Sequence, residues 1–108
     1  MDAPLEIDIT EAARLFKLPG SVVLIDVRET HERALCRIAG SLHIPMGDVP
    51  DRLAELPHDR QILVLCHHGG RSRRVTQFLR ANNYPLATNV AGGIDAWAEI
   101  VEPGMPRY

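Results

Sequence analysis

The chain has 108 residues, of which 45% are hydrophobic and 24% charged, and its 12 lysine and arginine residues against 14 acidic residues give a net charge of −2. This is the size and composition of one globular domain, so we interpret residues 1–108 as a single domain and exclude a disordered chain or a fibre. The slight negative charge also argues against nucleic acid or an anionic membrane as a partner.

The sequence carries no signs of export. The amino-terminal region has no signal-peptide pattern, and the longest apolar run, 62–66, is too short to cross a bilayer. The two cysteines, Cys36 and Cys66, do not form the pattern of a disulfide framework. We therefore expect a cytoplasmic protein that has at least one free thiol and does not contact a membrane.

Strands and helices alternate along the chain. In chain order we predict a strand at 5–7, a helix capped by Thr10, strands at 22–25 and 41–43, a short helix at 49–56, a strand at 62–65, a helix at 72–82, a strand at 88–90 and a helix at 94–100. In the helix at 72–82, Val75, Phe78 and Leu79 recur with helical spacing, so we expect all three to face the core.

The two strongest strands define the fold class. The runs 22–25 and 62–65 contain no polar residue and are rich in β-branched side chains. Such continuous runs are typical of strands that are covered on both faces in a parallel sheet. The sequence therefore predicts an α/β fold with a mainly parallel central sheet of about five strands and helices on both faces.

The residues that follow these two strands are the candidates for chemistry, because ligands bind outside the carboxyl ends of parallel strands. Asp26 and Arg28 follow the first strand, and the loop Cys66-His67-His68-Gly69-Gly70-Arg71-Ser72 follows the second. Adjacent glycines allow positive φ angles, so backbone amides can converge on one point, and the helix after the loop adds the positive end of its dipole. This pattern predicts an anion-binding loop.

Cys66 is the candidate nucleophile. Arg71, Arg73 and Arg74 place positive charge beside it, and no acidic residue lies between Cys66 and Arg74. Cations and a helix N-terminus lower the pKa of a cysteine, so we interpret Cys66 as a thiolate nucleophile. The alternative is an inert, buried cysteine followed by an ordinary turn; the cations and the paired glycines favour the nucleophile.

The remaining polar candidates have structural alternatives. Asp26 and Arg28 are assigned a supporting role, either in the same cleft or paired with each other or with neighbours to hold the loop, and we favour pairing. Cys36 is interpreted as a packing residue rather than a second reactive thiol. His67 and His68 adjoin Cys66, but three contiguous residues cannot easily converge on one ion, so no metal site is expected.

Four motifs, taken in order, resemble the rhodanese (thiosulfate sulfurtransferase) family in its single-domain form. The segment 66–72 resembles the active-site loop of that family, and the other three motifs are 24–29, 32–45 and 90–97. The resemblance covers nearly the whole chain. It implies the rhodanese-like three-layer fold, with Cys66 as catalytic residue and the rest of the loop, His67 to Ser72, as the binding site for a persulfide.

The resemblance also implies a reaction. A small-molecule donor such as thiosulfate would transfer a sulfur atom to Cys66, and cyanide, a thiol or a protein thiol would accept it, without a metal or organic cofactor. Four residues separate Cys66 from Arg71, one fewer than in the related cysteine phosphatases, which favours sulfur over phosphate chemistry. Two alternatives stay open: a persulfide carrier or interaction module without turnover, and a cysteine phosphatase.

Overall fold

The computed structural model describes residues 3–108. Its elements, in chain order, are β1 (Glu6–Ile7), α1 (Ile9–Phe16), β2 (Val22–Asp26), α2 (Thr30–Leu35), β3 (Leu42–His43), the 3-10 helix η1 (Met46–Glu55), β4 (Gln61–Leu65), α3 (Gly70–Ala81), β5 (Ala87–Val90), α4 (Gly93–Ala96) and the π-helix η2 (Trp97–Val101). No helix among these residues is both long enough and apolar enough to cross a membrane.

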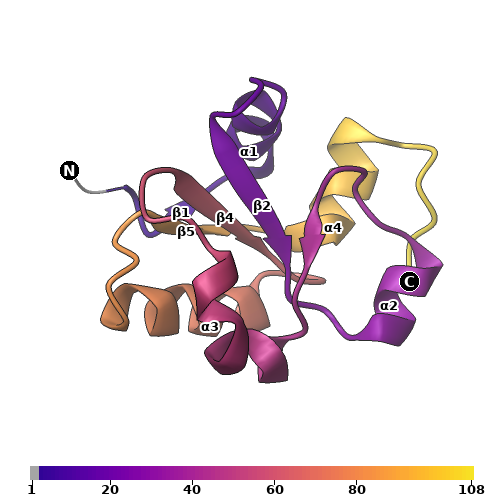
Figure 1. Cartoon of the computed structure of the whole chain (residues 1–108). Coiled ribbons are helices and arrows are strands. Elements are labelled where there is room, and N and C mark those ends of the chain that lie inside the picture. Colours follow the sequence, from indigo (N-terminus) through magenta and orange to yellow (C-terminus); the bar gives the residue numbers. More distant parts are fainter. Residues whose placement is uncertain (1–2) are drawn as a thin grey trace.

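The strands form one five-stranded sheet with the order β1-β5-β4-β2-β3, and every pair in it is parallel. The two apolar runs lie next to each other as β2 and β4, in a register that pairs Val22 with Gln61 and Asp26 with Leu65. Helices cover both faces of the sheet, with α3 and η1 on one side and α1 and α4 on the other (Figure 1). The predicted α/β fold is confirmed.

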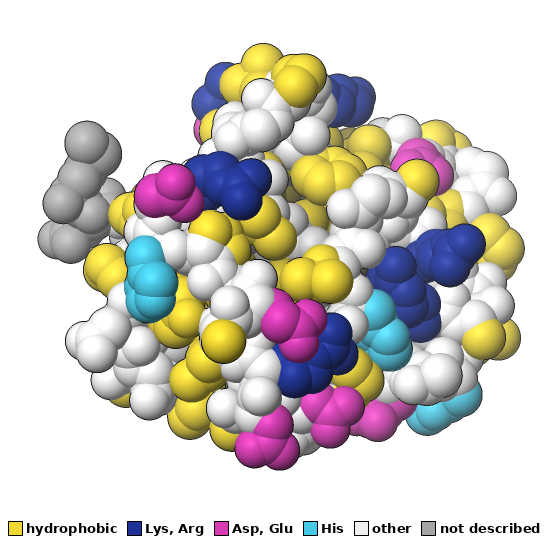
Figure 2. Space-filling model, in the orientation of Figure 1, with side chains coloured by type: hydrophobic (Ala, Val, Ile, Leu, Met, Phe, Trp, Pro, Cys, Tyr) yellow, Lys and Arg dark blue, Asp and Glu magenta, His cyan; other side chains and the backbone are white. Residues whose placement is uncertain are grey.

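Alternation along the central strands produces two separate cores. Ile62 and Val64 of β4 pack with Val75 and Leu79 of α3, in a cluster that also contains Cys66. Their neighbours Leu63 and Leu65 point to the opposite face and pack with α1, α4 and η2. Because both faces are buried, the strand needs no polar position, which explains its unbroken hydrophobic sequence. On the surface, basic and acidic side chains are interspersed over the face shown in Figure 2.

Several predicted element boundaries were wrong, for local reasons. Helix α1 begins two residues earlier than expected, because the side chain of Asp8, not Thr10, accepts the capping hydrogen bond from the Glu11 amide at 2.9 Å. The predicted helix at 49–56 is part of η1, which is interrupted by a non-helical backbone at Arg52. Helix α2 was not predicted at all.

Two further helices differ from the prediction. Helix α3 begins at Gly70 rather than at residue 72. The expected helix at 94–100 consists of the short α4 followed by the π-helical turn η2. In α3, Val75 and Leu79 are buried as expected, but Phe78 is 37% exposed and lines a surface hollow together with Met46 and Pro50 of η1. Helical spacing alone cannot distinguish the centre of a buried stripe from its edge.

The start of α4 fixes the backbone of the loop after β4. The amides of Ile94 and Asp95 donate to the carbonyl oxygens of Cys66 and His67, at 2.9 and 3.1 Å. This contact requires Gly93, which has φ +56° and lies so close that a Cβ atom would overlap both carbonyl groups. A glycine in the motif 90–97 thus positions a loop that lies more than twenty residues earlier in the chain.

We expect Gly93→Ala to lower the free energy of unfolding by about 3 kcal/mol, from steric overlap and a positive φ that alanine disfavours. Urea denaturation measures this loss. Gly47→Ala is the matched control, since a Cβ at Gly47 meets no atom within 4 Å and its φ is not positive. Equal stability of the two variants would show that α4 does not hold the loop as described.

Candidate active site

Cys66 lies directly after β4, at the start of the loop that leads into α3. Cys66 is only 1% exposed, yet it contributes to a surface depression. The other residues that line this depression are His67, His68, Gly70, Arg71 and Arg74. The loop turns back on the sulfur because Gly69 adopts φ +114°, a conformation that favours glycine. The Gly69 amide donates to Cys66 Sγ at 3.1 Å. Gly69 of the predicted loop therefore contacts the sulfur directly.

The surroundings of Cys66 favour its ionised form. Burial alone raises the pKa of the thiol, but hydrogen bonds from the Ser72 hydroxyl and from the amides of Ser72, Gly69 and His68 outweigh that effect and lower the pKa below its usual value. These donors come from the first turn of α3, which has 12 residues, and from the loop before it. The site can thus hold a negatively charged sulfur without a metal ion.

Ser72 links this sulfur to a second buried side chain. Its hydroxyl oxygen lies 3.2 Å from Cys66 Sγ and 2.5 Å from Oδ1 of Asn89 on β5. A hydroxyl group has one proton, so it can donate to only one of them at a time. Asn89 is oriented by its amide group, which donates to Glu6 and to the Gly69 carbonyl. Donation from the Ser72 hydroxyl to the Cys66 thiolate therefore requires its proton to point towards the sulfur rather than towards Asn89.

Arg71 does not point its guanidinium group at Cys66. Its two terminal nitrogens donate to the two carboxylate oxygens of Glu32 on α2, at 2.6 and 2.9 Å. Glu32 is buried, and this pairing, reinforced by the Glu29 amide, holds the pKa of the Glu32 carboxyl far below its usual value despite burial. The positive charge of Arg71 is therefore largely compensated, whereas Arg74 has no ion-pair partner among residues 3–108.

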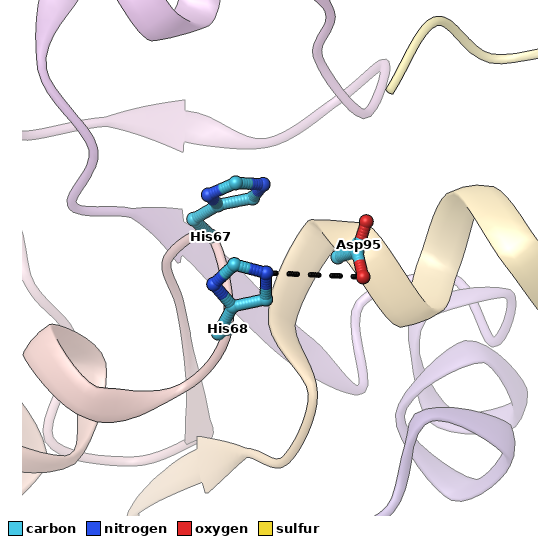
Figure 3. Close-up of side chains that lie close together, drawn as sticks. All are labelled: His67, His68 and Asp95. Carbon is cyan, nitrogen blue, oxygen red and sulfur yellow. Dashed lines mark ion pairs between the residues drawn. The ribbon is translucent and has the colours of Figure 1, made fainter. Parts of the chain in front are cut away.

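His67 and His68 lie with Asp95 of α4 in one group (Figure 3). Their potential ligand atoms are within 4.8 Å of one another, and His68 Nε2 is 3.8 Å from an oxygen of Asp95. However, the two imidazole rings face each other at 3.9 Å, so their in-plane lone pairs do not converge, and both oxygens of Asp95 accept hydrogen bonds from Arg107. This arrangement fits an ion-pair cluster better than a metal site.

Asp26 and Arg28 lie behind the loop rather than in the depression. Both are fully buried, and Arg28 donates to both carboxylate oxygens of Asp26, with its nearest contact at 2.8 Å. Arg33 adds a second ion pair to Asp26 at 3.2 Å. Arg28 also donates to the Cys36 carbonyl at 2.7 Å, so the pair anchors the turn after α2. Their geometry matches the interpretation in which they pair with each other.

The sequence did not indicate four residues that shape the site, namely Glu32, Asn89, Asp95 and Tyr108. Three of them contact the loop from α2, β5 and α4 and Tyr108 from the segment after η2, each at a separation of at least 17 residues from its partner. The only signal was the position of Glu32 in the second family-like motif and of Asp95 in the last one. Pairing of this kind depends on the three-dimensional arrangement of α2, β5 and α4, which the spacing of the sequence does not encode locally.

Comparison with known proteins agrees with this fold and site. The Rhodanese-like domain family matches residues 8–100, and the chain belongs to that family. A sulfurtransferase of Allochromatium vinosum is 34% identical over 93 residues, which are 86% of this chain and 87% of that protein. The adenylyltransferase and sulfurtransferase MOCS3 of Arabidopsis thaliana is 31% identical over 102 residues, but the match spans only 22% of its length.

A solved structure extends the likeness to the whole chain. The rhodanese-like domain protein of Staphylococcus aureus superimposes with a TM-score of 0.82 and 30% identity, and covers 100% of this chain and 99% of that one. These likenesses support a role in sulfur transfer and an enzyme of the rhodanese superfamily.

We expect Ser72→Ala to raise the pKa of Cys66, because the thiolate loses a hydrogen-bond donor while its burial is unchanged. The rate of alkylation by iodoacetamide, measured against pH on the Cys36→Ser background, should shift its midpoint upward by about one pH unit. Ser21→Ala is the control, since that hydroxyl donates to the remote Leu15 carbonyl at 2.6 Å. A midpoint that stays in place would contradict the role of Ser72 as a donor.

Proposed function

We propose that this chain is a sulfurtransferase that transfers sulfane sulfur from thiosulfate or a similar donor through a persulfide on Cys66. The observation that carries the proposal is the environment of Sγ, which accepts hydrogen bonds from the Gly69 amide and the Ser72 hydroxyl. These donors favour the thiolate, and the depression above it opens to solvent beside Arg74. A site that stabilises a sulfur anion in reach of small molecules suits this chemistry.

The proposed cycle has two displacement steps. The Cys66 thiolate attacks the outer sulfur of thiosulfate, the S–S bond of the donor breaks, and sulfite leaves with the bonding electron pair. Cys66 then carries a persulfide whose terminal sulfur is anionic. Cyanide or a thiolate attacks that terminal sulfur, forms thiocyanate or a new persulfide, and regenerates the Cys66 thiolate. Neither step needs an oxidant, a metal or an organic cofactor.

The position of Arg71 supports sulfur transfer over phosphate chemistry. An arginine that closes a phosphate loop directs both terminal nitrogens at the oxygens of the bound anion. Here both nitrogens donate to Glu32 instead, and only four residues separate Arg71 from Cys66. The donor anion is therefore expected to meet the loop amides, the N-terminus of α3 and Arg74.

The proposal also covers the domain that carries the site, the compartment and the sulfur acceptor. We propose that residues 1–108 act as one rhodanese-like domain, which the family match over 8–100 supports. Both cysteines are free, which supports a reducing compartment such as the cytoplasm. The acceptor is a small thiol, cyanide or the thiol of a protein.

The first test is the formation of the persulfide. After incubation with thiosulfate, we expect the intact mass of the wild-type protein to increase by one sulfur atom, an increase that cyanide reverses. Cys66→Ser should show no increase, because the nucleophile is absent. Cys36→Ser is the matched control, since Cys36 is also buried and free but lies outside the depression. A mass increase that persists in Cys66→Ser but is absent in Cys36→Ser would show that Cys36, and not Cys66, carries the persulfide.

Turnover separates the proposed enzyme from its alternatives. With excess thiosulfate and cyanide, we expect many equivalents of thiocyanate per chain in a steady-state assay, and no phosphate from an aryl phosphate. A carrier would load Cys66 once and release the sulfur only to its partner, so one persulfide per chain without sustained thiocyanate formation would support that alternative. Release of phosphate would support the phosphatase instead.

A further inference from the structure

The segment after η2 returns to the candidate active site. In Figure 1 the last residues of the chain, in yellow, run from α4 and η2 back to α2. There the ring of Tyr108 stacks on His67, with a centroid distance of 3.9 Å and an interplanar angle of 9°. Tyr108 thus contacts one of the loop residues beside Cys66, although 41 positions separate Tyr108 from His67.

The hydroxyl group of Tyr108 connects two charged networks. It accepts a hydrogen bond from Arg28 Nη1 at 3.0 Å and donates to Glu32 Oε2 at 2.7 Å. The same oxygen of Glu32 accepts from Arg71 at 2.9 Å. Burial, and next the hydrogen bond to Glu32, raise the pKa of Tyr108 to about 12 against the opposing effect of Arg28, so the hydroxyl remains a donor at neutral pH.

We infer that Tyr108 is a positioning residue for the sulfur-transfer site, which fixes Arg71 through Glu32 and fixes the His67 ring by stacking. The inference rests on the proposed function, since it assigns a role in the same site. Two of the three contacts of the side chain, the stacking on His67 and the hydrogen bond to Glu32, end on a residue of the loop 66–72 or on the direct partner of one. One side chain therefore holds two of the residues that line the depression.

The contacts of Tyr108 fit this role better than a role in stability. The residue is 40% exposed, so its side chain is only partly buried and adds less to stability than a core tyrosine would. Arg28 does not depend on it, because Asp26 and the Glu32 and Cys36 carbonyls already accept from Arg28. Removal of the Tyr108 hydroxyl therefore affects mainly Glu32, because its Oε2 atom loses one of its two hydrogen-bond donors.

The loss of the Tyr108 hydrogen bond to Glu32 predicts a specific change in the binding of the sulfur donor. With fewer hydrogen bonds from elsewhere, the Glu32 carboxylate attracts Arg71 more strongly, and less of the Arg71 charge is available to an anionic donor in the depression. The weaker attraction affects the bound sulfur donor and the transition state equally. Such a change raises KM and leaves kcat unchanged. Thiosulfate, a dianion, should report this effect.

The experiment compares Tyr108→Phe with Tyr84→Phe. Tyr84 is a matched control, because its ring also stacks on a histidine, His58, at 4.1 Å, and its hydroxyl donates to the Leu53 carbonyl at 2.6 Å. We expect Tyr108→Phe to raise KM for thiosulfate about fivefold with kcat within about twofold of wild type. Tyr84→Phe should leave KM and kcat unchanged, while it lowers Tm by at least as much as Tyr108→Phe does.

Tyr108→Ala tests the stacking contact separately. It removes both the hydroxyl and the ring, so KM should rise beyond that of Tyr108→Phe, and the difference between the two variants measures the part that the ring restores. Kinetic constants of Tyr108→Phe equal to those of wild type, or changes shared by Tyr84→Phe, would overturn the inference.

A measurement that does not depend on sulfur transfer keeps the two proposals distinguishable. On the Cys36→Ser background, the pH profile of Cys66 alkylation by iodoacetamide should move upward in Tyr108→Phe, because the negative charge of Glu32 near the loop is less compensated. If wild type shows no thiocyanate formation but this shift occurs, the proposed function fails and the positioning role stands. If turnover is normal and neither KM nor the profile changes, the positioning role fails alone.

Discussion

A charged sulfur in a buried position is the constraint on which this site depends. Cys66 directly follows a strand that is covered on both faces, and burial by itself favours the neutral thiol. The backbone offsets this cost, because the loop and the first turn of α3 direct amide groups at Sγ. Backbone amides are hydrogen-bond donors that do not titrate and that lie on a rigid frame. Their stabilisation of the Cys66 thiolate therefore does not change with pH.

The charged side chains around the loop act mainly on one another. Arg71 is paired with Glu32, and Arg28 with Asp26, so two of the cations nearest to the site carry compensating charge beside them. Pairs of this kind fix geometry more than they supply net potential. The attraction for an anionic donor therefore comes mainly from Arg74 and the N-terminus of α3, and only the uncompensated part of the Arg71 charge adds to it. Specific orientation and general attraction are thus provided by different groups.

The sequence determined the local features well and the long-range ones poorly. The strands β2 and β4 and the loop 66–72 were predictable, since each is defined by a contiguous run of residues. The partners of the loop were not, because Glu32, Asn89 and Asp95 reach it only after the chain has crossed the sheet. Phe78 was misplaced for a related reason: the spacing that places it on the face of Val75 and Leu79 does not reveal that η1 leaves a hollow beside it.

These long-range partners also explain why a loop with two adjacent glycines can hold a defined shape. Glycine loses more conformational freedom on folding than other residues, so such a loop needs external restraints. Here α4 holds its start through the carbonyl groups of Cys66 and His67, and Asn89 holds its middle through the Gly69 carbonyl. Glu32 and Tyr108 hold its side chains from the other direction. Since each restraint comes from a different part of the chain, the geometry at Cys66 depends on the whole fold, and a change far from the sulfur can alter its reactivity without touching it.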